Sequence, residues 1–260
     1  MFLIDTHCHL TTAPLNTDIT SVITRARENS VNTIIVPAYN QEDWPKVLNV
    51  SQRSNIHPAL GLHPWEAHHS PSVETLKIQL AQAIADSDTK VVAIGEIGLD
   101  TKVDSPPLEI QIPVFNAQIE LAADLDLPII LHCRGAFSEL LDPIKRHDGK
   151  IRGVIHAFSR GPELAHRFHS AGLHFGLGGA VTRFNARKIV RGARVIPLNR
   201  IVLETDAPSI GVAGVRPEDT EPRHVADVAR ALAELRGEDL SLIAEATTEN
   251  AIRLFNLPAQ

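Results

Sequence analysis

The chain has 260 residues, of which 43% are hydrophobic, and its formal net charge is −6. That length fits one large α/β barrel or two ordinary domains, and the apolar content is sufficient for a sizeable core. The negative charge excludes a general electrostatic attraction to polyanions, so any nucleic-acid binding would have to be local. No apolar run reaches the roughly 20 residues of a membrane span, and the N-terminus lacks a signal-peptide pattern, so we expect a cytoplasmic protein without membrane contact.

Short apolar runs alternate with segments of helical period from one end of the chain to the other. The predicted strands cover residues 2–5, 33–36, 57–62, 91–96, 128–132, 153–156, 173–177 and 201–204. Several are nearly continuous hydrophobic runs, as expected of parallel strands covered on both faces. Between them lie segments such as 110–124, where apolar residues recur at three- and four-residue steps. This alternation predicts a (β/α)8 TIM barrel, organised as a single domain over residues 1–260.

A doubly wound open sheet is the alternative fold for such an alternation. That fold normally carries a glycine-rich, phosphate-binding turn directly after its first strand. Here the position holds Asp-Thr-His-Cys-His at residues 5–9. The first turn therefore favours the barrel.

Polar side chains recur where the predicted strands end. In a TIM barrel the carboxyl ends of the strands and the loops after them form the active-site face. His7 and His9 follow the first strand, and because side chains alternate along a strand, both imidazoles project to one side. Later strands end at or just before His63, Glu96, His132, His156 and Asp206. A single histidine after a strand is commonly an ordinary turn or core residue, but the same coincidence at six strands indicates a shared site.

Four imidazoles and two carboxylates exceed the ligands that one tetrahedral zinc normally takes, so they predict a site for two metal ions. We expect His7, His9 and Asp206 to hold one ion. His132 and His156 would hold the second, with Glu96 as the bridge between the two. The cofactors are then two divalent ions per chain, drawn from Zn, Mn, Mg or Ni, and the imidazoles favour a transition metal. Asp206 would also accept a proton from the attacking water.

Four neighbouring residues have open interpretations. Arg134 lies two residues after His132, so its guanidinium could bind substrate phosphate oxygens or form a structural salt bridge. Glu204 could orient a ligand, or it could be a barrel-interior carboxylate paired with a lysine or arginine. Cys8 and Cys133 each follow a candidate ligand, and strand alternation turns both thiols away from the site. We expect both to be buried structural thiols.

Six motifs, in order, carry a resemblance to a known family. They are Asp-Thr-His-Cys-His-Leu from residue 5, Gly-Leu-His-Pro from 61, Gly-Glu-Ile-Gly-Leu-Asp from 95, Ile-Leu-His-Cys-Arg from 130, His-Ala-Phe-Ser from 156 and Leu-Glu-Thr-Asp-Ala-Pro from 203. Together they closely resemble the TatD family of metal-dependent deoxyribonucleases, within the amidohydrolase-type barrels. The resemblance spans essentially the whole chain.

The resemblance implies a TIM barrel, divalent metals and hydrolysis of phosphodiester bonds in DNA by a metal-bound hydroxide, with 3′–5′ exonuclease action as one form of it. The family's metal positions fall on His7, His9, Glu96, His132, His156 and Asp206. We expect Glu96, Asp206 and His63 to be the catalytic residues, and by the same similarity His63 faces the substrate phosphate, where Arg134 is the second candidate substrate-binding residue. The expected partner is DNA or a small nucleotide, bound by a monomer without an obligate protein partner.

Three positions depart from the family pattern, all in segments expected to contact substrate. Thr101 stands where the family usually has an aromatic residue, Phe137 where it has a second histidine, and Thr220 where a late loop has asparagine. These departures bear on the substrate more than on the hydrolysis.

Two other functions stay open at this stage. Hydrolysis of a lactone, cyclic amide or other small ester would use the same metal chemistry. Many binuclear amidohydrolases have a carboxylated lysine as the bridge, so Glu96 weakly favours the phosphodiesterase. A non-catalytic metal-binding barrel would be expected to lack some ligands or the candidate base, and this chain retains them all.

Overall fold

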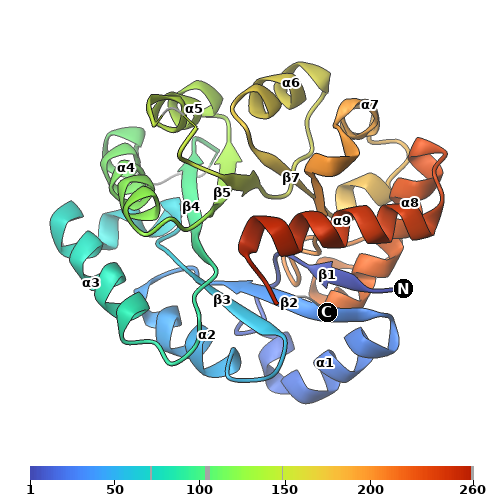
Figure 1. Cartoon of the computed structure of the whole chain (residues 1–260), viewed down its shortest axis with the longest axis horizontal. Coiled ribbons are helices and arrows are strands. Elements are labelled where there is room, and N and C mark those ends of the chain that lie inside the picture. Colours follow the sequence, from blue (N-terminus) through green and yellow to red (C-terminus); the bar gives the residue numbers. More distant parts are fainter. Residues whose placement is uncertain (71, 103–105, 148, 259–260) are drawn as a thin grey trace.

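The computed structural model describes residues 1–70, 72–102, 106–147 and 149–258, and in them eight parallel strands surround a central axis (Figure 1). The strands pair in sequence order from β1 to β8. Their bounds are β1 Leu3–Asp5, β2 Val31–Pro37, β3 Ile56–Leu60, β4 Ala93–Asp100, β5 Ile129–Arg134, β6 Gly153–Ile155, β7 His174–Leu177 and β8 Ile201–Leu203. The predicted (β/α)8 barrel is confirmed.

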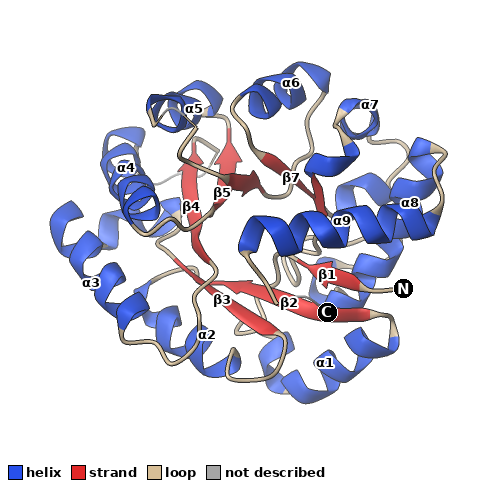
Figure 2. Ribbon diagram, viewed as in Figure 1, coloured by secondary structure: helices blue, strands red, loops and turns tan. Residues whose placement is uncertain are grey.

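Helices form an outer layer around the strands (Figure 2). Their bounds are α1 Ile19–Glu28, α2 Trp44–Val50, α3 Val73–Ala85, α4 Leu108–Asp124, α5 Phe137–Arg146, α6 Pro162–Ser170, α7 Arg187–Val195, α8 Val225–Arg236 and α9 Leu240–Phe255. Across the described ranges, no helix combines the length and the apolar character that crossing a bilayer would require.

The apolar core has two parts, and the smaller one fills the amino-terminal end of the barrel. Inward side chains of the strands, such as Ile4, Ile35 and Ile130, pack there against Leu254 and Phe255 of α9. The larger part lies mostly between the strands and the surrounding helices. Because α9 closes the amino-terminal end of the barrel, the polar residues of the interior are left to the opposite end.

The barrel closes between β8 and β1 through residues just beyond the strands. The Thr6 backbone N–H donates to the Leu203 carbonyl at 3.0 Å, and the Asp206 N–H donates to the His7 carbonyl at 2.8 Å. The buried Asp5 carboxylate accepts from the Thr205 backbone N–H at 2.9 Å and from its hydroxyl at 2.6 Å. Burial raises the pKa of Asp5 to about 7 in spite of these hydrogen bonds. This closure places the residues after β1 beside those after β8.

The predicted strand limits agree with the observed ones within two residues, except at the end of β4. The prediction ended this strand at Glu96, whereas β4 continues to Asp100. Its pairing with β5 shifts register between Ile94 and Ile97 and then continues, with Gly98 opposite His132. Glycines and the register shift obscured the strand pattern in this segment.

Gly98 is required where β4 passes β5. Its φ is +151°, and a Cβ atom there would lie 1.9 Å from the His132 carbonyl oxygen. We expect Gly98→Ala to lower the free energy of unfolding by roughly 3 kcal/mol, because both strain and overpacking oppose it. Urea unfolding of the metal-free protein measures the change.

Gly172→Ala is the matched control, since Gly172 also has a positive φ, of +80°, but a Cβ there would meet nothing within 4 Å. It should cost about 1 kcal/mol, the cost of a left-handed alanine alone. Equal losses in the two variants would contradict the proposed contact.

Candidate metal centre

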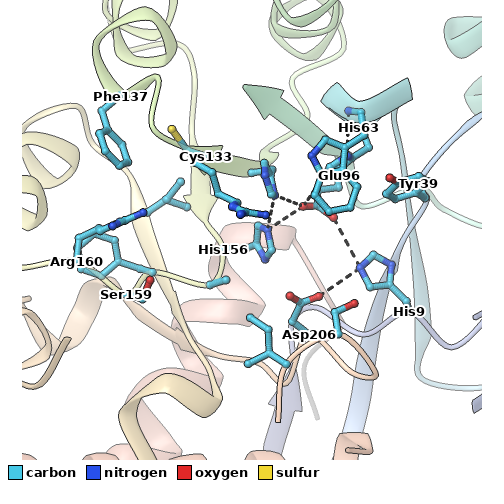
Figure 3. A pocket seen from close by; sticks show the side chains of 18 of the residues that line it. His9, Tyr39, His63, Glu96, Cys133, Phe137, His156, Ser159, Arg160 and Asp206 are labelled. Atoms are coloured by element: carbon cyan, nitrogen blue, oxygen red, sulfur yellow. Dashed lines mark hydrogen bonds and ion pairs between the residues drawn. The ribbon is translucent and has the colours of Figure 1, made fainter. Parts of the chain in front are cut away.

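The six predicted ligand residues converge at the carboxyl end of the barrel. Figure 3 shows His9, Glu96, His156 and Asp206 of this set directed toward one another. Glu96 lies in β4 and His132 in β5, whereas the other four lie in the loops directly after β1, β6 and β8. All six are buried: His7, His9, Glu96, His132, His156 and Asp206. His7 and His9 flank Cys8, which forms an isolated β-bridge with Ala207, so the alternation expected of a strand persists beyond β1.

Glu96 divides its two carboxylate oxygens between two groups of imidazoles. Oε2 lies 3.3 Å from Nε2 of His7 and 3.7 Å from Nε2 of His9. Oε1 lies 2.8 Å from Nε2 of His156 and 3.1 Å from Nδ1 of His132. One carboxylate therefore connects two clusters of potential ligand atoms.

The spacing within the first cluster suits one tetrahedral ion. Nε2 of His7 and Nε2 of His9 are 3.2 Å apart, and Asp206 Oδ1 lies 3.6 Å and 3.3 Å from them. Atoms about 2.0–2.1 Å from a tetrahedral zinc ion are about 3.3–3.4 Å from one another. In the second cluster, Nε2 of His156 and Nδ1 of His132 are 3.4 Å apart.

The chemistry of these atoms also fits a cation. Burial is the main cause that lowers the pKa of His7, to about 4, so its imidazole is neutral near neutral pH. Two buried imidazole nitrogens that face each other repel through their lone pairs unless a proton or a metal ion lies between them. Imidazole and carboxylate ligands together suit divalent transition metals. The His, Glu and Asp cluster is therefore suited to divalent metal.

Asp100 orients His132, a role that the sequence pattern did not predict. His132 donates from Nε2 to Asp100 Oδ2 at 2.8 Å, and Trp65 Nε1 donates to the same oxygen at 3.0 Å. Burial raises the pKa of Asp100, but the hydrogen bond from His132 and other contacts outweigh this and lower it to about 2. Because Nε2 carries the hydrogen, Nδ1 presents its lone pair to the cluster.

His63 presents a hydrogen rather than a lone pair to the cluster. Its Nδ1 accepts from the Trp65 backbone N–H at 3.2 Å, so the hydrogen of the neutral ring lies on Nε2. Nε2 is 3.4 Å from Glu96 Oε1, and the ring stacks on Tyr39 with centroids 4.7 Å apart. Burial lowers the pKa of His63, which keeps the ring neutral. This arrangement suits a donor to substrate more than a metal ligand.

Glu204 lies behind His156 in the barrel interior and is 1% exposed. Its Oε1 accepts the backbone N–H of Ala157 and is 3.8 Å from Nδ1 of His156. Gly176 provides the space, because a Cβ there would lie 2.1 Å from Glu204 Oε2. No lysine or arginine among the described residues pairs with Glu204, and the candidate ligand His156 is the basic side chain within 4 Å of it in that part of the chain. Burial raises its pKa to about 8.

A pocket of about 610 Å³ opens over the cluster, and Arg134 lines it. Arg134 Nε is 3.7 Å from Asp100 Oδ2, and its side chain is 46% exposed, so its head remains accessible to a ligand. Cys8 is buried, as expected.

The prediction for Cys133 was wrong, because this residue is partly exposed and lines the pocket. It lies near the end of β5, beyond the fully buried part of the strand.

Of the three departures from the family pattern, Phe137 lines the pocket, whereas Thr220 is fully buried away from it.

The sequence model of the family described as TatD related DNase matches residues 4–256. The chain belongs to this family. It is 40% identical over 258 residues to the metal-dependent hydrolase YjjV of Escherichia coli, covering 98% of each chain. It is 35% identical to the metal-dependent hydrolase YabD of Bacillus subtilis, covering 98% of this chain and 99% of that one. The crystal structure of YjjV superposes with a TM-score of 0.92 at 38% identity, with 98% of each chain covered.

Asp100→Asn should weaken metal binding by about 10- to 100-fold, as is usual when the partner that orients a histidine ligand is changed. The amide keeps the shape but loses the charge that holds His132 in one tautomer. Competition with a chromophoric chelator measures the affinity. Asp86→Asn removes an exposed carboxylate that accepts a hydrogen bond from Gln82, and it should leave the affinity unchanged. Equal affinities of the Asp100 variant and the unmodified protein would refute the role.

Metal binding should release protons at neutral pH. Burial lowers the pKa of His156, but the charge of Glu96 and the hydrogen bond to it outweigh burial and raise the pKa to about 10. The metal-free ring therefore carries a proton that a cation must displace. Calorimetric titration in two buffers of different ionisation enthalpy should give different apparent enthalpies, and identical values would contradict the prediction.

Proposed function

We propose that the protein hydrolyses phosphodiester bonds in DNA or small nucleotides with two divalent ions. The observation that carries this proposal is the division of the Glu96 oxygens between two ligand clusters. His7, His9 and Asp206 would hold one ion and His132 with His156 the other, with Glu96 shared. Membership in the TatD-related DNase family supports phosphodiester hydrolysis over other ester chemistry.

Divalent ions in these positions would supply Lewis-acid charge to a phosphoryl oxygen and lower the pKa of a coordinated water. Asp206, with Oδ1 3.3 Å from His9 Nε2, would take the proton that the attacking water loses. His63 would donate its Nε2 hydrogen to a non-bridging phosphate oxygen, and Arg134 would add a charged donor at the pocket wall. The buried surroundings strengthen each of these interactions because little water screens them.

The pocket favours single strands, strand ends or nucleotides as substrates over the middle of a duplex. Its volume of about 610 Å³ lies within the range of small-molecule sites, which is roughly 300–1,000 Å³. The net charge of −6 gives no general attraction for a long polyanion.

The function is tested with metal-stripped protein reloaded with Mg, Mn, Zn or Ni. Bis-p-nitrophenyl phosphate and a labelled single-stranded oligonucleotide are the substrates, and the product ladder separates exonuclease from endonuclease action. The His7→Ala/His9→Ala variant should lose metal-dependent cleavage. Metal binding without diester cleavage, together with hydrolysis of a lactone, would instead identify the small-ester function.

Asp206→Asn should lower kcat at least about 100-fold, the usual contribution of a general base, while metal still binds in part. The amide keeps one oxygen for an ion but cannot accept a proton. Asp227→Asn, which changes an exposed carboxylate paired with Arg230, is the control. Full activity of the Asp206 variant would eliminate this residue as the base.

A further inference from the structure

One wall of the pocket is aromatic and lies away from the metal centre. Figure 3 shows Phe137 and Arg160 on one side, His9 and Tyr39 on the other, and His156 with Glu96 between them. Phe168 contacts Phe137 and Phe158 edge to face, with centroids 6.3 Å and 6.2 Å away. Phe158 and Phe168 are buried, so this wall is a fixed surface.

The Arg160 guanidinium rests on this wall, 5.4 Å from the centre of the Phe137 ring. Its backbone is held as well, because α7 approaches so closely that a Cβ on Gly192 would lie 2.2 Å from the Arg160 carbonyl oxygen. A guanidinium that lies over the face of an aromatic ring keeps N–H groups free to donate to an anion.

Arg160 has no ionic partner among the residues that the structure describes. Neither a carboxylate within 4 Å nor a side-chain hydrogen bond satisfies it there. Arg134, on the same pocket, lies 3.7 Å from Asp100. A fixed, unpaired cation in a partly apolar concave surface attracts an anionic group of the ligand.

That anionic group differs from the phosphate under attack. The scissile phosphate must lie at Glu96 and its imidazoles, and Arg160 contacts none of those atoms. The pocket of about 610 Å³ is far larger than one phosphate and has room for a nucleotide unit. In a strand, each such unit carries a further phosphate.

We propose that Arg160, stacked on Phe137, binds the phosphate adjacent to the scissile one in an oligonucleotide substrate. The enzyme then prefers substrates with at least two phosphates. This inference rests on the proposed phosphodiesterase function and extends it to a second phosphate subsite.

The test compares cleavage of the internal diester in TpT, pTpT and TpTp by metal-loaded protein. The unmodified protein should cleave pTpT or TpTp with a higher kcat/KM than TpT. Arg160→Gln should lower that ratio roughly ten-fold, the size expected for the loss of one charge-assisted contact. Arg160→Lys should retain part of the ratio, because the charge stays while the stacked fork is lost.

Arg167→Gln is the matched control, because Arg167 is an exposed arginine on α6 that contacts Ser138 and does not line the pocket. It should leave the ratio unchanged, and thermal unfolding verifies that each variant is folded. A ratio that Arg160→Gln does not change, with TpT and bis-p-nitrophenyl phosphate still cleaved, overturns the subsite alone. No cleavage of any diester by the unmodified protein overturns the proposed function and the subsite with it.

Discussion

The Glu96 carboxylate is the group on which the rest of the site depends. A buried charge is stable only when it is paired, and imidazoles are arranged around both of its oxygens. Those imidazoles lie on or directly after different strands. Their convergence therefore requires the ends of several strands to be positioned accurately relative to one another. The barrel meets that demand because its strands are short, parallel and packed on every side. The candidate ligand cluster and the barrel geometry are thus parts of one arrangement.

The two ends of the barrel differ in role: apolar packing at one end stabilises the fold, and polar residues at the other end form the candidate site. At the amino-terminal end, α9 packs its apolar side chains onto the inward residues of the strands. At the other end, buried polar groups such as Asp5 and Glu204 occupy the interior, and burial raises the pKa values of both. Such groups cost stability, which the apolar end supplies.

Much of the site could be predicted from the chain because strand alternation places His7 and His9 on one side and a barrel gathers strand ends. The role of Asp100 was missed because β4 was expected to stop at Glu96, and the strand continues through a register shift that no simple period reveals. The sequence pattern did not indicate a role for Arg160, because its position over Phe137 depends on the packing of α5, α6 and α7. Tertiary contacts of this kind have no counterpart in local pattern.

The closure of the barrel has a consequence for how the protein matures. His7 and His9 are synthesised before Asp206, which lies beyond β8, and the backbone hydrogen bonds between these segments complete the barrel. A nascent chain that has not yet released β8 from the ribosome holds the early histidines without their final carboxylate. Folding through such distant contacts is slow compared with helix formation. A metal site that uses all three side chains would therefore be complete only after β8 and the segment that follows it have been synthesised and have met the segment after β1.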